Sequence, residues 1–150
     1  GTSYADSDAA SASGTTTAGS GSGEGDTEKT VEKTSGLQAS TTATTMDSYI
    51  SYKNSAENTY SDPMRIYSGN TFTISATNAV ITKVEITCDT SKPITGLTGG
   101  TVTVDSGATS NKTENSNVVT YTITGSTKSF AVKASAQFRV SGLKVTYKIN

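Results

Sequence analysis

The 150-residue sequence contains no histidine, no tryptophan and only one cysteine, Cys88. Histidine is the usual general base near neutral pH and a common zinc ligand, so its absence disfavours acid–base catalysis and zinc binding. A single cysteine cannot form an intramolecular disulfide, which excludes the small disulfide-stabilised scaffolds without excluding secretion. We therefore expect a protein that is not an enzyme and that uses no metal or cofactor.

Long apolar runs and clustered basic residues are also missing. No stretch approaches the roughly 20 apolar residues of a membrane span, and the first residues lack the charged and then apolar layout of a signal peptide. We therefore expect a soluble, mature chain with no membrane span. The ten Lys and Arg residues after position 40 are scattered singly. Because nucleic-acid backbones require a basic stripe, nucleic acid is a poor candidate partner.

The composition changes sharply near residue 40. Residues 1–40 are rich in Ser, Thr, Gly and Ala, and they carry six acidic against two basic residues. Their only large apolar residues are Tyr4, Val31 and Leu37. Such a segment cannot offset the entropy that it would lose on ordering. We predict a disordered linker over residues 1–40, with an r.m.s. span of roughly 35 Å for a flexible coil, and one folded domain over residues 41–150.

After Thr45, apolar residues alternate with hydroxyl residues, which predicts β-strands. The longest run is predicted to present two faces, with Val80, Val84, Ile86 and Cys88 on one and Ile81, Lys83, Glu85 and Thr87 on the other. This arrangement points the Cys88 thiol into the core. Residues 119–123 and 130–134 also alternate, and the Gly125-Ser126 connection between them suits a hairpin.

The last strand contains a change of phase. Phe138 and Val140 occupy even positions, whereas the apolar residues from Leu143 onward occupy odd ones, so we predict a bulge at Ser141-Gly142. Shorter strands are predicted at residues 46–52, 64–67, 71–76 and 102–104, and loops at residues 54–63, 68–70, 89–93 and 105–116. About eight short strands and no convincing helix predict an all-β antiparallel sandwich, either jelly-roll or immunoglobulin-like.

Three segments of the chain occur together in a known kind of domain. They are Met64–Ser75 (MRIYSGNTFTIS), Ile81–Thr87 (ITKVEIT) and Phe138–Tyr147 (FRVSGLKVTY). In this order and spacing, they resemble a β-sandwich domain of uncharacterised surface and secreted proteins of gut anaerobic bacteria, many of them lipoproteins. The resemblance spans residue 45 to the C-terminus. It implies a bacterial cell-surface or extracellular location, a lipid anchor upstream of the chain, and no catalytic residues.

Four of the seven tyrosines lie between residues 49 and 67. Rings gathered on one face would offer apolar surfaces to a sugar, and neighbouring amides and charges would bond its hydroxyls. The candidate ligand-binding residues are Tyr49, Tyr52, Tyr60, Asn58, Asp62 and Arg65. The alternative is that the rings belong to the core, where strand alternation also places Tyr67.

The remaining reactive groups have simpler interpretations. The seven carboxylates after residue 40 lie mostly in loops, with no preferred glycosidase pair and no Asp-x-Asp-x-Asp-Gly calcium loop. Cys88 is predicted to be a buried, inert thiol, because no histidine can activate it. Arg65 and Arg139 are the only arginines. Each can anchor a carboxylate of the sandwich or of a ligand, and we expect the internal ion pair.

These features predict a non-catalytic binding or adhesion module. It would be extracellular, monomeric, and presented on a flexible tether to a glycan or a cell-surface protein. The alternative is a structural spacer or assembly subunit of the bacterial surface, whose exposed strand edges join neighbours by β-augmentation. An enzyme is a third class, and it would need a concave pocket that holds two carboxylates of perturbed pKa.

Overall fold

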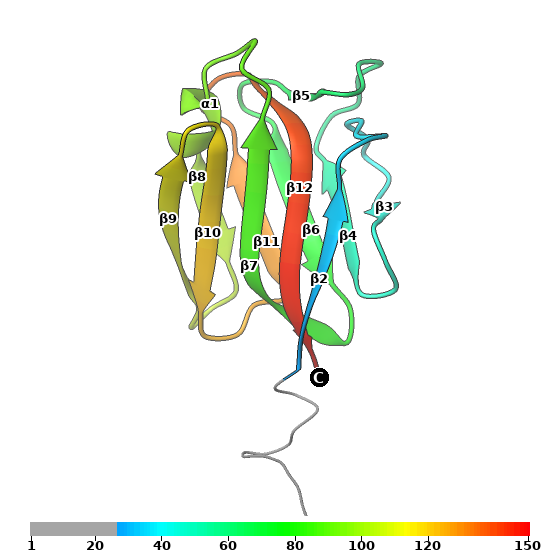
Figure 1. Ribbon diagram of the computed structural model, residues 1–150, viewed down its shortest axis with the longest axis vertical. Coiled ribbons are helices and arrows are strands. Elements are labelled where there is room, and N and C mark those ends of the chain that lie inside the picture. Colours follow the sequence, from blue (N-terminus) through cyan, green and yellow to red (C-terminus); the bar gives the residue numbers. More distant parts are fainter. Residues whose placement is uncertain (1–26) are drawn as a thin grey trace, which may run out of the picture.

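Alternating apolar and hydroxyl side chains build a β-sandwich, which confirms the predicted fold class. The computed structural model describes residues 27–150, which form eleven strands in two antiparallel sheets (Figure 1). The first sheet has the order β2 (Glu28–Lys33), β12 (Phe138–Ile149), β7 (Ala79–Cys88), β10 (Val118–Thr124) and β9 (Thr109–Asn115), and β5 (Met64–Ile66) also pairs with β12. The second has the order β3 (Thr44–Thr45), β4 (Ile50–Asn54), β6 (Thr71–Ala76), β11 (Ser129–Lys133) and β8 (Thr101–Val104).

The strands pair as nested partners from the ends of the fold inward. β2 pairs with β12, β6 with β11, and β7 with β10, as in a long hairpin that is folded over on itself. This nesting is characteristic of a jelly roll. One departure is that β9 pairs with β10 in the first sheet, so that β8 ends the second sheet. The structure thus favours the first of the two arrangements that the sequence leaves open.

The core fills the space between the two sheets. Tyr121 of β10 and Phe130 of β11 meet across this space, with ring centroids 4.9 Å apart. Aromatic pairs of this kind contribute about 0.5–1.5 kcal/mol beyond the burial of their area. The alternation predicted for both strands is confirmed, because Val119, Tyr121 and Ile123 are buried on β10, as are Phe130 and Val132 on β11.

Two register shifts along β12 keep apolar side chains in the core. The pairing of β12 with β7 passes from Val140 to Gly142 without a partner for Ser141, which confirms the predicted bulge. A second shift, at Thr146 and Tyr147, leaves Thr82 of β7 without a partner. Ile81 is consequently buried. The sequence predicts that Val80, rather than Ile81, lies on the buried face of residues 80–88, and this prediction is wrong.

The folded part of the chain begins before residue 41, so the predicted boundary is wrong. Residues 28–33 form β2, which pairs with β12 from Leu143 to Lys148. Leu37 and Ala39 are buried in the core. A polar segment can form an edge strand because backbone hydrogen bonds to a neighbour hold it, even when few side chains are buried. Residues 1–26, the rest of the predicted linker, lie outside the described residues.

Four local predictions also need correction. The Gly125-Ser126 connection joins β10 of one sheet to β11 of the other, so it is a crossover and not a hairpin. Strand β9 lies within the loop predicted at residues 105–116. A short helix, α1 (Thr95–Thr98), precedes β8. The strand predicted at residues 46–52 is replaced by β3 and β4, on either side of a turn.

The structure predicts that Cys88 resists modification in the native protein. Its side chain is 1% exposed on β7, and burial raises the pKa of its thiol to about 12. Because the thiolate is the reactive form, labelling by a disulfide reagent at pH 8 should be at least about 100-fold slower in the native than in the denatured chain. The measurement is the release of the reagent chromophore with and without denaturant. Equal rates would contradict the burial of this strand.

Candidate functional site

The loop between β4 and β5 is held in place by the Asn58 side chain. Its Nδ2 donates a hydrogen bond to the Arg65 carbonyl oxygen at 3.0 Å, and its Oδ1 accepts one from the Tyr60 backbone N–H at 3.1 Å. Gln38 Nε2 in turn donates to the Asn58 carbonyl oxygen at 3.0 Å. Asn58 therefore positions the loop over β5, and it brings Tyr60 close to Arg65.

The Arg65 guanidinium lies over the Tyr60 ring. Its Cζ atom is 3.5 Å from the ring centroid, and Tyr60 remains 46% exposed. A cation–π contact at an exposed site contributes about 0.5–1 kcal/mol. Stacking uses the face of the guanidinium and leaves the N–H groups at its edge available as donors. Arg65 is thereby held at the surface in a defined orientation.

The second arginine lies directly across the sheet from the first. The β5–β12 register pairs Arg65 with Arg139, and both side chains point outward because their neighbours, Met64 and Ile66 on β5 and Phe138 and Val140 on β12, are buried. Among residues 27–150, neither arginine has a carboxylate oxygen within 4 Å, since the ion pair found there joins Lys112 to Glu114. The prediction of internal ion pairs for the arginines is therefore wrong.

Arg139 is only partly satisfied by its neighbours. Its Nη1 donates to Ser91 Oγ at 3.0 Å, while its buried Nε has no partner among the described residues. Asp89, just after β7, donates its backbone N–H to the Arg139 carbonyl oxygen at 2.8 Å. Hydrogen bonds from Ser91 hold the pKa of Asp89 below its usual value, and the charge of Arg139 adds a smaller effect.

Tyr67, just after β5, and Gln137, just before β12, extend this surface. The register of β5 and β12 ends at the pair of Phe138 and Ile66, and its continuation by one residue would set Gln137 opposite Tyr67. Tyr67 is 36% exposed, so the prediction that it is a core ring is wrong: Met64 and Ile66 point inward, and alternation turns residues 65 and 67 outward. Gln137 Nε2 is buried without a partner in the described part of the chain. We call these five residues the Arg/Tyr patch: Tyr60, Arg65, Tyr67, Gln137 and Arg139.

Two of the predicted ring contacts lie elsewhere. Tyr52 is 2% exposed, because it shares the inward face of β4 with Ile50, and its ring centroid lies 5.8 Å from that of Phe72. Tyr49 is half-buried, and its ring centroid lies 5.5 Å from that of Tyr147. Tyr147 and Arg139 lie near opposite ends of β12. The structure brings Tyr60, Asn58 and Arg65 together and separates Tyr49 and Tyr52 from them.

Asp62, the last predicted contact, instead anchors the segment after β2. Its two carboxylate oxygens accept the backbone N–H groups of Leu37, at 2.9 Å, and Gly36, at 2.8 Å. These two hydrogen bonds lower the pKa of Asp62, that of Leu37 most, and Lys33 adds a small effect. The carboxylate is therefore used to hold the fold together.

Asp62→Asn should lower the melting temperature at pH 7, because the amide has only one acceptor oxygen for the two N–H groups. The pKa of Asp62 is lowered in the folded state, so its stabilisation is present above its unfolded pKa of about 3.9 and is lost as pH falls through the folded value. The difference in melting temperature between wild type and variant should accordingly shrink between pH 5 and pH 2. Thermal melts across this range test it, and a constant difference would contradict the role given to the carboxylate.

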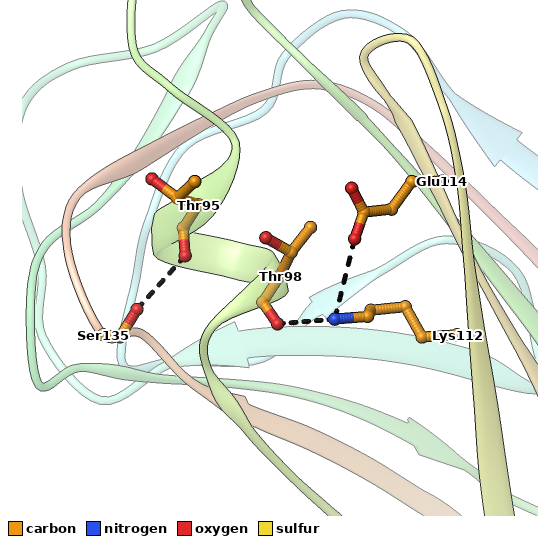
Figure 2. Close-up of polar contacts among 5 residues, drawn as sticks. All are labelled: Thr95, Thr98, Lys112, Glu114 and Ser135. Carbon is orange, nitrogen blue, oxygen red and sulfur yellow. Dashed lines mark hydrogen bonds and ion pairs between the residues drawn. The ribbon is translucent and has the colours of Figure 1, made fainter.

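Helix α1 supports the loop that leads to the Arg/Tyr patch. Figure 2 shows Ser135 Oγ donating to the Thr95 carbonyl oxygen at 3.2 Å, and Lys112 Nζ reaching the Thr98 carbonyl oxygen at 2.7 Å and Glu114 at 3.7 Å. The Ser135 backbone N–H also donates to the Gly96 carbonyl oxygen at 3.0 Å. Two residues beyond Ser135 lies Gln137, so α1 fixes the backbone from which this side chain projects.

Three cavities among the described residues are lined by none of the five patch residues, although Asn58 lines one of them. One of about 250 Å³ is lined by Lys53 and Asn54, one of about 270 Å³ by Gln38 and Glu57, and one of about 190 Å³ by Asp47 and its neighbours. None of the three is lined by two carboxylates, which a glycosidase of the usual kind would need. Within residues 27–150, no group of three or more acidic or cysteine side chains is placed to hold a metal ion.

Comparisons with known proteins add no relative to this picture. No protein-family model matches the chain, and no curated protein or solved structure matches it significantly. The resemblance to surface proteins of gut bacteria therefore stays a prediction. No helix in the described part of the chain is long and apolar enough to cross a membrane.

Proposed function

We propose that this chain is a non-catalytic binding module that recognises glycans through the Arg/Tyr patch. One observation carries the proposal. Tyr60 and Tyr67 are the large hydrophobic side chains that residues 27–150 leave exposed; Tyr60 stacks on Arg65, and Tyr67 follows Arg65 by two residues. Exposed rings next to hydrogen-bond donors suit the alternating apolar and polar surface of a sugar.

The position of the patch suits presentation from a surface. Glu28, where the described chain begins its first strand, pairs with Lys148, and Arg139 lies about 30 Å from Lys148 along β12. Figure 1 shows β5 at the opposite end of the sandwich from the start of β2. A tether formed by the Ser/Thr/Gly-rich residues before β2 would leave the patch facing outward. The bacterial cell-surface location is proposed from the sequence resemblance.

A glycan array probed with the full chain tests this function. We expect wild type to bind at least one glycan, and the double variant Tyr60→Ala/Tyr67→Ala to bind it at least tenfold more weakly, as for aromatic contacts at the centre of an interface. Tyr49→Phe is the control, because Tyr49 packs against Tyr147 at the other end of β12, and this variant should bind like wild type. An array on which wild type binds no glycan would sink the proposal.

A structural role in assembly is the second candidate, and one edge of the fold favours it. Strand β8 (TVTV) ends the second sheet and contains neither a charged residue nor proline, the features that usually protect an edge from pairing. The other sheet ends in β9, which carries Lys112 and Glu114. If β8 joins neighbouring copies, light scattering after gel filtration should show oligomers at high concentration. A monomer throughout would argue against this role.

A further inference from the structure

We propose that the Arg/Tyr patch is specific for acidic polysaccharides, with Arg65 and Arg139 holding a carboxylate or sulfate group of the ligand. This inference rests on the proposed function and adds the chemical class of the glycan. It follows from the charge of the patch, from its unpartnered donors and from its exposed rings.

The charge of the patch is not balanced within the fold. Arg65 and Arg139 face each other across β5 and β12, and like charges directly opposite each other on a sheet destabilise it. No carboxylate of residues 27–150 lies within 4 Å of either guanidinium. Asp89 acts on Arg139 from a greater distance, and its carboxylate is engaged by Ser91. An anion bound over this part of β5 and β12 would offset the repulsion.

The patch also retains donors that the described residues leave without a partner. Stacking on Tyr60 leaves the edge of the Arg65 guanidinium free. The described residues provide no acceptor for Arg139 Nε or for Gln137 Nε2, although both atoms are buried. Buried donors are normally satisfied, and Gln137 and Arg139, two residues apart, each retain a donor that a ligand oxygen would satisfy once a side-chain rotation brings it to the surface. Guanidinium edges match the oxygens of carboxylate and sulfate groups particularly well.

The rings favour a glycan over an acidic peptide as the source of the anion. Tyr60, which stacks on Arg65, and Tyr67, two residues after it, are exposed, and they provide flat apolar areas of the size of a sugar ring. An extended peptide would instead need an open strand edge to pair with, and β5 offers only three residues, of which Arg65 already has its carbonyl oxygen engaged by Asn58 Nδ2. The two sugar-borne anions, uronate and sulfate, share the same chemistry here.

Binding of the full chain to five immobilised polymers tests the inference. Polygalacturonate carries only carboxylates, dextran sulfate only sulfates, heparin both, dextran neither, and polyglutamate presents carboxylates on a peptide.

The variants to be compared are Arg139→Gln and Arg65→Lys, of which the second keeps the charge and loses the planar guanidinium group. Lys128→Gln, an exposed position at the other end of the sandwich, is the charge-matched control. Thermal melts establish that each variant is folded. If Arg139→Gln does not fold, the binding of Arg65→Lys decides the test.

We expect wild type to bind at least one acidic polysaccharide and not dextran. Each arginine variant should bind at least about tenfold more weakly, with Lys128→Gln within twofold of wild type. Binding to polygalacturonate alone identifies the carboxylate, and binding to dextran sulfate alone identifies the sulfate. Equal binding to polyglutamate, or an equal loss in Lys128→Gln, overturns the inference.

Failure of this inference can be told apart from failure of the proposed function. If wild type binds only neutral glycans and the tyrosine double variant loses that binding, the module still recognises glycans and the acidic class is wrong. If wild type binds none of the five polymers and no glycan on the array, both are wrong.

Discussion

A chain that begins at residue 41 is expected to lose most of the stability of the fold. Residues 27–40 contribute β2, which pairs with β12, and the buried side chains of Leu37 and Ala39. Truncating a buried leucine alone to alanine costs about 2–5 kcal/mol, and total stabilities are only about 5–15 kcal/mol. Removal of the strand also exposes the edge of β12 and leaves Asp62 without its two backbone donors.

Urea unfolding of residues 27–150 and of residues 41–150 measures this loss. The longer chain should show a cooperative transition, whereas the shorter one should be largely unfolded or aggregated without denaturant. Leu37→Ala in the longer chain is the intermediate case, with an expected loss of about 2–5 kcal/mol in the free energy of unfolding. Equal transition midpoints for the two chains would show that the fold begins at residue 41 after all.

Gly96→Ala is the single substitution from which we expect a large effect on both stability and binding. Gly96 is buried in α1, and an added methyl carbon would lie 2.7 Å from the Ala136 carbonyl carbon and 2.8 Å from the Gln137 carbonyl oxygen. Both are backbone atoms, so the clash cannot be relieved by a side-chain rotation. Overpacking of this kind costs about 1–3 kcal/mol or more, and relief would require movement of the backbone that carries Gln137.

The expected result for Gly96→Ala is a lower melting temperature together with weaker binding to the ligand of the patch. Thr98→Ala in the same helix is the control. The Thr98 contact in Figure 2 is made by its backbone carbonyl, which the substitution keeps, so this variant should melt and bind nearly like wild type. Wild-type stability in Gly96→Ala would contradict the close packing of α1 against residues 136 and 137.

The elements that the sequence predicts well are those whose two faces differ. Buried residues alternate with more exposed ones along β10 and β11, and the large apolar side chains follow this alternation. The phase change near Gly142 reveals the bulge. Strands β2 and β9 escape prediction because their side chains are mostly exposed and their pairing depends on the backbone of a neighbour. The phase of β7 is ambiguous because Val80 and Ile81 are both apolar, and only the position of its bulge decides which one is buried.

The patch is only partly visible in the sequence. Tyr60, Asn58 and Arg65 lie close together along the chain, and a local loop unites them. Arg139 and Gln137 lie more than 70 residues later, and only the pairing of β5 with β12 brings them alongside. One feature of the sequence points to their relation: the chain has only two arginines, and each lies between two apolar residues. Their common register could not be read without the strand order.

Chemical-shift mapping of the full ¹⁵N-labelled chain with short oligosaccharides tests the location of the site most directly. The probes are a trigalacturonate, a heparin-derived hexasaccharide and a neutral maltotriose. We predict that one of the acidic probes shifts the backbone amides of Tyr60, Arg65, Tyr67, Gln137 and Arg139, and that the amides around Tyr49 and Lys53 do not move. Shifts confined to those other regions, or no shifts with any of the three probes, would contradict the assignment of the Arg/Tyr patch as the binding site.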